Sequence, residues 1–155
     1  MLFITRKENF YQAGIVCAVA ILVVYKRHGL AFLLTAAAAI ALTDASSHYI
    51  LKEVIARPRP CNALPDMEMI IGCSGSFSFP SNHAGNTFAA ATLIGLCFRN
   101  TTLLAFAFAL LVCYSRVYLK VHYPADVLAG ALYGSLIGCL CYRHIYSRFL
   151  KFIKP

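Results

Sequence analysis

Five long apolar runs make up most of this chain and leave only short polar segments between them. The runs cover residues 10–25, 30–51, 80–98, 102–119 and 123–142. A helix rises about 1.5 Å per residue, so such runs can cross a hydrocarbon layer of roughly 30 Å, the first only marginally. Because 60% of the residues are hydrophobic and 13% are charged, the sequence predicts an all-α integral membrane bundle of about five transmembrane helices.

The first apolar run has the outline of a secretory signal, with Arg6 and Lys7 ahead of it. A signal peptide would end at a small-residue cleavage site, whereas the basic residues 26–28 follow this run. We therefore interpret the run as a helix of the mature protein. No internal repeat divides the chain, and residues 1–155 are predicted to form a single membrane-embedded domain.

The formal charge of +8 comes from cations clustered at the ends of the apolar runs. This pattern favours a membrane as the partner, and we expect no nucleic-acid binding. One side of the predicted bundle carries seven cations: Lys26, Arg27, Arg99, Arg143, Arg148, Lys151 and Lys154. The other side also carries seven: Arg6, Lys7, Lys52, Arg57, Arg59, Arg116 and Lys120. If Lys52, Arg59 and Arg116 belong to a site, the balance becomes seven against four and predicts a cytoplasmic C-terminus.

The junction of the last two apolar runs holds three ionisable side chains, Arg116, His122 and Asp126. Pro124 suits a first helical turn, so the last helix is predicted to begin beside it. Asp126 then shares a face with His122 and can accept a hydrogen bond from one ring nitrogen, which leaves the other nitrogen as a nucleophile. For this pair alone, the plainer alternative is that Asp126 complements the helix dipole and His122 caps the helix.

Two further polar clusters flank the one long loop. Lys52 and Arg59 precede it, and taken alone they fit an ordinary interfacial basic cluster. After the loop, the sequence Pro-Ser-Asn-His opens an Ala-rich helix. Helix capping would account for Ser81 and Asn82, but it does not account for His83.

Asp44, His48 and Lys52 are spaced to lie on one face of the second apolar helix. A carboxylate within a membrane segment is costly, so this face is predicted to point into the bundle or toward water. We expect Asp44 to pair with a neighbouring side chain, and a supporting role at a site is the alternative.

The spacing of cysteines and glycines predicts two packing features. Cys61 and Cys73 bracket the long loop on the external side and are predicted to form a disulfide. Gly130, Gly134 and Gly138 recur every four residues in the last helix, which favours close helix packing within the monomer over a dimer contact.

The predicted topology brings the three polar clusters to one membrane surface. Three cations and a helix N-terminus form a cradle suited to a multiply charged oxyanion such as phosphate. In such a site His122 attacks phosphorus and His83 protonates the departing alkoxide. The cations supply the charge that a metal would carry, so we expect no metal and no other cofactor.

Together these residues resemble the signature of the type 2 phosphatidic acid phosphatase family. That signature is Lys, six residues, Arg-Pro; Pro-Ser-Gly-His; and Ser-Arg, five residues, His, three residues, Asp. Ten of its eleven specified positions match in order and spacing: Lys52, Arg59, Pro60, Pro80, Ser81, His83, Ser115, Arg116, His122 and Asp126. Asn82 stands where the family usually has glycine, and it adds bulk and a second donor beside the phosphate.

The resemblance implies a phosphohistidine on His122, oriented by Asp126, with His83 as the acid and then as the base for water. It also implies a set of phosphate ligands: Lys52, Arg59, Ser81, Asn82 and Arg116.

The sequence therefore predicts a metal-independent lipid phosphatase at the periplasmic face of a bacterial-type inner membrane, acting on a membrane lipid phosphate or diphosphate without a required oligomer. Loop 61–79 is too short for a closed lid, which favours bulky substrates such as lipid A 1-phosphate or undecaprenyl diphosphate, with Arg57 and Lys120 at the rim. Phosphatidylglycerophosphate and phosphatidic acid are alternatives. An anion transporter or channel is an alternative of another class, but it would place its charges near the bilayer midplane.

Overall fold

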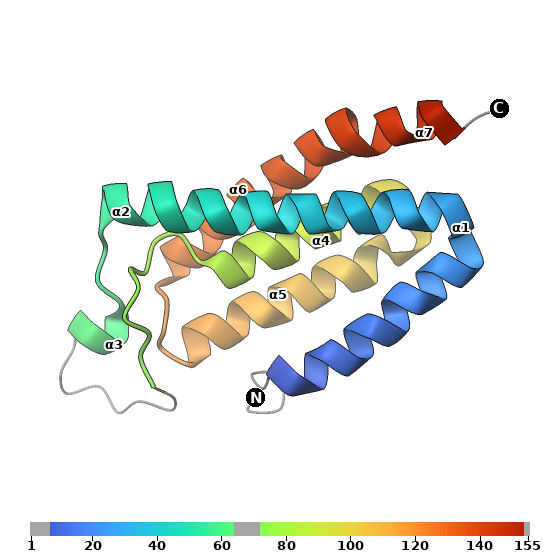
Figure 1. The fold of residues 1–155 in the computed structure, drawn as a ribbon. Coiled ribbons are helices and arrows are strands. Elements are labelled where there is room, and N and C mark those ends of the chain that lie inside the picture. Colours follow the sequence, from blue (N-terminus) through green and yellow to red (C-terminus); the bar gives the residue numbers. More distant parts are fainter. Residues whose placement is uncertain (1–6, 64–71, 154–155) are drawn as a thin grey trace.

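The computed structural model describes residues 7–63 and 72–153, and within them every regular element is a helix. The elements are α1 (Lys7–Ser46), η2 (Ser47–Leu51), α2 (Lys52–Ile55), α3 (Pro60–Ala63), α4 (Asn82–Cys97), η3 (Arg99–Thr101), α5 (Thr102–Tyr118), α6 (Pro124–Cys141), η4 (Tyr142–Tyr146) and α7 (Ser147–Ile153). The helix α4 packs against α1, α5 and α6 (Figure 1). The predicted all-α class is confirmed for the described residues.

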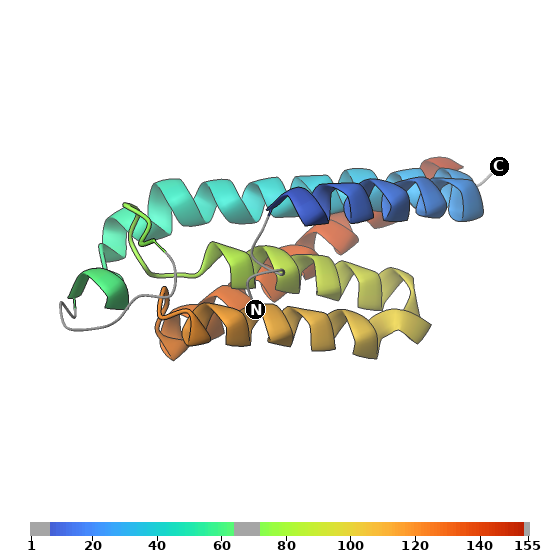
Figure 2. The same ribbon diagram turned by 90° about the horizontal axis from the view of Figure 1, so that it is seen from below.

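The helix α1 reverses direction at Lys26 and so forms two arms. Lys26 has φ 48° and ψ −119°, which is outside the helical region. Figure 2 shows both arms in one layer of the bundle, with α5 in the opposite layer. A Cβ at Gly29 would lie 2.5 Å from the carbonyl oxygen of Ile21, so only glycine allows the arms to approach this closely after the reversal. The reversal falls in the polar segment predicted between the first two apolar runs.

Three helices in the described residues are long and apolar enough to cross a membrane: Gly14–Ala63, Arg99–Tyr118 and Pro124–Phe152. Their outer faces expose large apolar side chains, among them Leu103 and Leu132. The predicted count of about five is not reproduced, because the first of these helices includes both arms of α1 and α4 has only 16 residues. The coarser prediction of a helical, membrane-spanning protein agrees with the structure.

The helices α4 and α6 are in backbone contact through glycines. A Cβ on Gly134 would lie 2.0 Å from the carbonyl oxygen of Gly85. A Cβ on Gly130 would lie 2.5 Å from that of Ser81, and Gly138 is similarly confined. The glycine spacing therefore serves packing within the monomer, as predicted. This contact holds the N-termini of α4 and α6 side by side.

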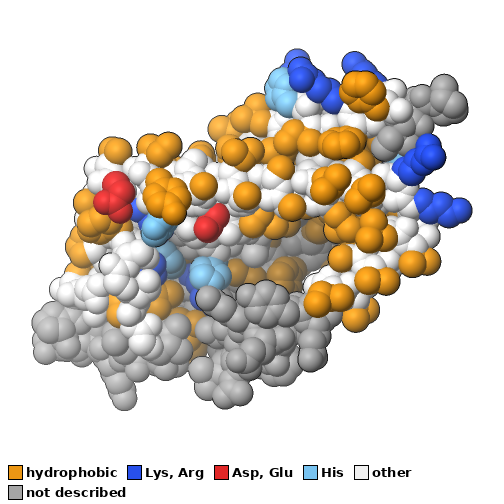
Figure 3. Space-filling view, in the orientation of Figure 1, with side chains coloured by type: hydrophobic (Ala, Val, Ile, Leu, Met, Phe, Trp, Pro, Cys, Tyr) orange, Lys and Arg blue, Asp and Glu red, His pale blue; other side chains and the backbone are white. Residues whose placement is uncertain are grey.

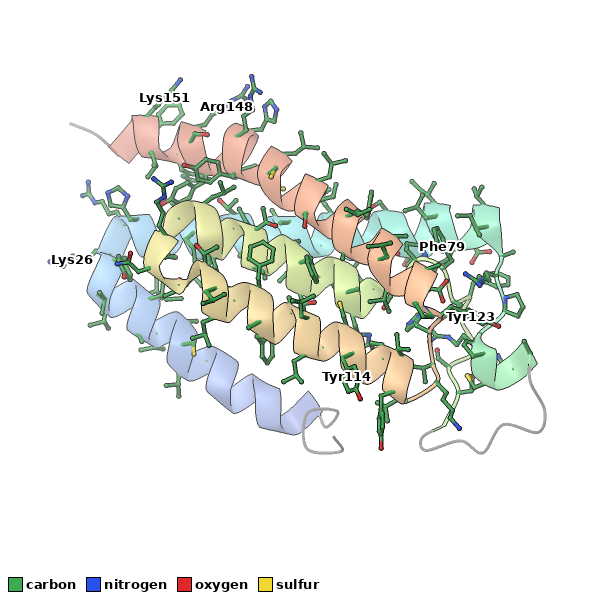
Figure 4. All side chains as sticks on the ribbon, turned by 180° about the vertical axis from the view of Figure 1, so that it is seen from behind. Lys26, Phe79, Tyr114, Tyr123, Arg148 and Lys151 are labelled. Atoms are coloured by element: carbon green, nitrogen blue, oxygen red, sulfur yellow. A yellow bond between two sulfur atoms is a disulfide. The ribbon has the colours of Figure 1, made fainter. Side chains whose placement is uncertain are left out.

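The two ends of the bundle differ in chemistry. Figure 4 places Lys26, Arg148 and Lys151 at one end and Phe79 and Tyr123 at the other. The second end contains α2, α3 and the turn between α5 and α6 (Figure 1). The three polar clusters predicted from the sequence therefore meet at one end of the molecule.

Candidate active site

A polar cavity of about 310 Å³ lies at the end of the bundle where α4 begins. Figure 3 shows histidine side chains gathered on this part of the surface. The cavity is lined by Asp44, Arg59, Gly72, Ser74, Ser76, Asn82, His83, Arg116, Val121 and His122. Five of the eight predicted site residues thus share one cavity. The other three, Lys52, Ser81 and Asp126, are buried and are not among its lining residues.

His122 lies in the turn between α5 and α6 and is 4% exposed. Its Nε2 is 3.3 Å from Nη1 of Arg59, and its Nδ1 is 3.4 Å from Oγ of Ser78. The Ser78 hydroxyl donates its one proton to Oδ2 of Asp126. This network therefore assigns the ring proton to Nδ1, which donates to Ser78. The lone pair is then on Nε2, as a nucleophilic imidazole requires.

Burial lowers the pKa of His122 below its usual value of 6.5, because charging the ring in a dehydrated site is unfavourable. The nearby Asp126 carboxylate raises the pKa, whereas the positive charges of Arg59 and Lys52 lower it further. The net lowering keeps His122 neutral at pH 7.

Asp126 is fully buried in the first turn of α6, and three donors hold its carboxylate. Oδ1 accepts a hydrogen bond of 2.9 Å from Nη1 of Arg57. Oδ2 accepts from Oγ of Ser78 and, at 2.9 Å, from the Tyr123 backbone N–H. Oδ2 is 3.6 Å from Nδ1 of His122, so the predicted direct hydrogen bond is replaced by a contact through Ser78. The helix-terminus alternative is correct in one respect, because Asp126 also binds the N-cap N–H of α6.

The rim position predicted for Arg57 needs correction. Its side chain is 36% exposed, but the guanidinium pairs with Asp126 and stacks 3.9 Å from the centre of the Tyr123 ring. The charge of Arg57 thus acts on Asp126 inside the protein.

Arg59 and Lys52 bind the protein backbone beside the cavity. Arg59 is 8% exposed, and its N–H groups all have acceptors in segments 76–77 and 121–122, at 2.8 to 3.5 Å. Lys52 donates from Nζ to the carbonyl oxygen of Phe77 at 2.6 Å. An ammonium has two further N–H groups, whereas Arg59 must exchange an existing bond to reach a ligand. Phosphate binding by either cation stays a prediction.

Among the predicted phosphate ligands, Arg116 and Ser81 each have polar side-chain atoms with no hydrogen-bond partner in the described residues. Arg116 is 7% exposed and lines the cavity, and within the described residues its one hydrogen bond runs from Nε to Oγ of Ser115, at 3.2 Å. The buried hydroxyl of Ser81 has no hydrogen-bond partner in the same part of the chain. Buried polar groups are normally paired, so these two are the groups best prepared to receive an anion.

The start of α4 does not use its side chains as caps. Ser81 is the N-cap residue but makes no side-chain capping bond, so the capping interpretation of Ser81 is wrong. Nδ2 of Asn82 donates to Asp44 at 2.7 Å, and Oδ1 of Asn82 accepts from Ser47 at 2.7 Å. The expectation that Asp44 pairs with a neighbour is confirmed. His83 is exposed and lines the cavity.

The predicted disulfide between Cys61 and Cys73 is confirmed, with a Cα–Cα distance of 6.1 Å. It ties α3 to the segment that carries Ser74 and Ser76 into the cavity wall. Residues 64–71 lie outside the described part of the chain, and so does the centre of the loop on which the open-mouth prediction rests. In the described residues, no group of three or more His, Cys, Asp or Glu side chains could hold a metal ion.

Sequence reasoning missed the role of Ser78. It lies in a Gly- and Ser-rich loop and has no regular spacing to Asp126, so no periodic signal could have identified it. Only the folded loop brings its hydroxyl between the carboxylate and the ring of His122.

The profile of the PAP2 superfamily matches residues 28–150, and the chain belongs to this superfamily. It is 34% identical over 120 residues to a lipid A 4'-phosphatase of Bacteroides thetaiotaomicron, which covers 73% of this chain and 53% of that protein. It is 35% identical over 125 residues to an undecaprenyl-diphosphatase of Sulfolobus acidocaldarius, with coverages of 78% and 58%.

A crystal structure of another PAP2-type protein has a similar fold. The PAP2-type phosphatidylglycerolphosphate phosphatase from Bacillus subtilis matches with a TM-score of 0.63 at 27% identity, over 96% of this chain and 72% of that one. The resemblance seen in the sequence signature is thus confirmed at the level of the family. The chain spans little more than half the length of the two curated relatives named above.

Proposed function

We propose that this protein is a lipid phosphatase that works without a metal, through a phosphohistidine intermediate on His122. One observation carries the proposal: a single cavity at the end of the bundle is lined by two histidines and two arginines. Membership in the PAP2 superfamily and the phosphatase names of its relatives support an ester or diphosphate of a lipid as the substrate class.

In the proposed reaction, Nε2 of His122 attacks phosphorus and the bond from phosphorus to the leaving oxygen breaks. His83 gives its proton to that oxygen. His83 then takes a proton from water, which attacks phosphorus and breaks the P–N bond to release phosphate. Arg116, the Ser81 hydroxyl and the N-terminus of α4 bind the non-reacting oxygens, and Lys52 and Arg59 join them by exchanging bonds to the loop.

We place the site at the periplasmic face of a bacterial-type inner membrane. The end of the bundle opposite the site carries Lys26, Arg148 and Lys151, which favours the cytoplasm for that end. Lipid A 1-phosphate and undecaprenyl diphosphate are the favoured substrates, in keeping with relatives named for lipid A and for undecaprenyl diphosphate. Phosphatidylglycerophosphate and phosphatidic acid are the alternatives. One copy of the chain, embedded in the bilayer, contains the whole proposed site, so no oligomer is required.

The test is phosphate release from these four lipids by purified protein in detergent with EDTA present. We expect release to persist in EDTA and to be abolished in His122→Ala, with a folded protein recovered. His83→Ala should lose less activity on substrates with better leaving groups, because its role is protonation. Loss of wild-type activity in EDTA, or full activity of folded His122→Ala, would overturn the proposal.

A further inference from the structure

One wall of the cavity carries a carboxylate that the proposed reaction does not use. Asp44 lies on the second arm of α1 and lines the same cavity as His83, Arg116 and His122. Its side chain is exposed rather than buried in the bundle. A negative charge beside a phosphate site opposes phosphate binding, so its position calls for a separate function.

Two side chains of α4 hold this carboxylate in place. Oδ1 of Asp44 accepts from Nδ2 of Asn82 at 2.7 Å and from Nδ2 of Asn86 at 3.3 Å. Asn82 is fixed in turn, because its Oδ1 accepts from Oγ of Ser47, which is 1% exposed. A glycine at position 82 could make neither bond. The residue that departs from the family signature thus makes the shorter of the two hydrogen bonds that anchor Asp44.

The second carboxylate oxygen is available to a ligand. Within the described residues, no donor binds Oδ2 of Asp44. Nearby lining residues include the hydroxyls of Ser74 and Ser76. At about 310 Å³ the cavity is at the small end of ligand sites, with room for a phosphate and the group directly attached to it. The surroundings of that attached group are therefore polar and, at Asp44, negatively charged.

We propose that Asp44, anchored by Asn82, determines specificity by accepting a hydrogen bond from a hydroxyl of the leaving group and by disfavouring a second phosphate there. This inference rests on the proposed phosphatase function and narrows its substrate class. Monophosphates carried by a sugar or polyol fit the cavity, whereas a diphosphate brings a further anion toward the carboxylate. Between the two favoured substrates, the inference selects lipid A 1-phosphate over undecaprenyl diphosphate.

Two matched lipid pairs test this in detergent micelles with EDTA. The first pair is oleoyl lysophosphatidic acid and its analogue without the sn-2 hydroxyl, which differ by one donor beside the phosphate. The second pair is phosphatidic acid and diacylglycerol pyrophosphate with the same acyl chains, which differ by one phosphate. We expect wild-type kcat/KM to favour the first member of each pair by about tenfold. In the first pair a hydrogen bond to the charged Asp44 is lost with the hydroxyl, and in the second pair the added phosphate is repelled by the Asp44 carboxylate.

The variants are Asp44→Ala and Asn82→Gly, with Glu53→Gln as the control. Glu53 is an exposed acid in α2 at the same end of the bundle and is not among the cavity-lining residues, so it controls for net charge. Asp44→Ala should bring both ratios to within about twofold of unity, Asn82→Gly should shift them in the same direction, and Glu53→Gln should leave them unchanged.

Each ratio is also measured as a ratio of Kd values in the His122→Ala background, with and without Asp44→Ala. Wild-type protein that binds these lipids but releases no phosphate would overturn the phosphatase function, while the Kd ratios would still decide the role of Asp44. If Asp44→Ala leaves both ratios at their starting values, or if Glu53→Gln shifts them equally, Asp44 has no role in specificity.

Discussion

The Ser78 hydroxyl joins the carboxylate of Asp126 to the ring of His122, and its removal should slow the reaction with little effect on folding. Ser78 is fully buried, and its Oγ donates to Oδ2 of Asp126 and lies 3.4 Å from Nδ1 of His122. In Ser78→Ala the Asp126 carboxylate is still 3.6 Å from Nδ1 of His122, which is too far for a normal hydrogen bond. The ring then loses the acceptor of its Nδ1 proton and keeps only the contact from Arg59 to Nε2 among those described above, so its orientation is less well fixed.

The magnitude follows from the bonds that remain. Asp126 keeps Arg57 and the Tyr123 N–H, so its charge is not left unpaired and unfolding should cost about 1–2 kcal/mol less than in wild type. A hydrogen bond in a charged network contributes about 1.5–3 kcal/mol. If this energy is lost from the transition state, kcat falls by about 10- to 150-fold. We expect KM to change much less, because Ser78 is not among the cavity-lining residues.

The assay is kcat and KM of purified variants with EDTA, next to a thermal unfolding curve for each. Thr35→Val is the matched control: Thr35 is also fully buried, but its hydroxyl donates to Ala31 O within α1, and Thr35 is not among the cavity-lining residues. Ser78→Cys keeps a weak donor and should recover part of the loss. A folded Ser78→Ala protein with more than half of the wild-type kcat would refute the reasoning, as would equal losses in Ser78→Ala and Thr35→Val.

Three further predictions concern charge, pH and packing. Arg116→Ala should raise KM for lipid phosphates at least tenfold with native stability. Arg59→Ala should raise KM and also lower the unfolding temperature, because it leaves loop carbonyls unpaired. Kinetics and unfolding curves of both variants test this difference. Because burial lowers the pKa of His122, the acid limb of the kcat/KM profile should lie below pH 6.5. An acid limb centred above pH 7 would contradict this prediction. Gly134→Ala should destabilise the protein by about 1–3 kcal/mol or more, since its Cβ would lie 2.0 Å from Gly85 O; unchanged stability in a denaturation series would exclude that contact.

Much of the fold followed from the lengths of the apolar runs and from glycine spacing. The break between the first two runs appears as the reversal at Lys26, and the glycines of α6 contact α4 as predicted. The number of spans did not follow, because run length alone does not show that α4 has only 16 helical residues. Sequence spacing specifies which residues share a face, but not how long each helix becomes once packed.

For the candidate site, too, the sequence predicted some features and missed others. Sequence spacing predicted that His83, Arg116 and His122 lie close together, and all three line one cavity. The prediction was possible because each residue is fixed by its position on a helix or a tight turn. Spacing could not show which groups Arg57 and Lys52 would bind, since long flexible side chains have many rotamers and take partners from loops. Those partners become visible only when the segment around Phe77 is folded against α2.

The partners of the cations also explain how so much charge is tolerated in a buried site before a ligand arrives. Isolated buried charges are expensive, and removing one partner of a buried pair is destabilising. Here Arg57 pairs with Asp126, and Lys52 and Arg59 bind loop carbonyls, so three of the four cations are compensated by the protein. Arg116 is the cation whose terminal nitrogens are not committed within the described residues. An entering phosphate would therefore meet one available guanidinium and a loop already held in position. Such a preorganised site can stabilise the charge of a transition state without the reorganisation that water would need.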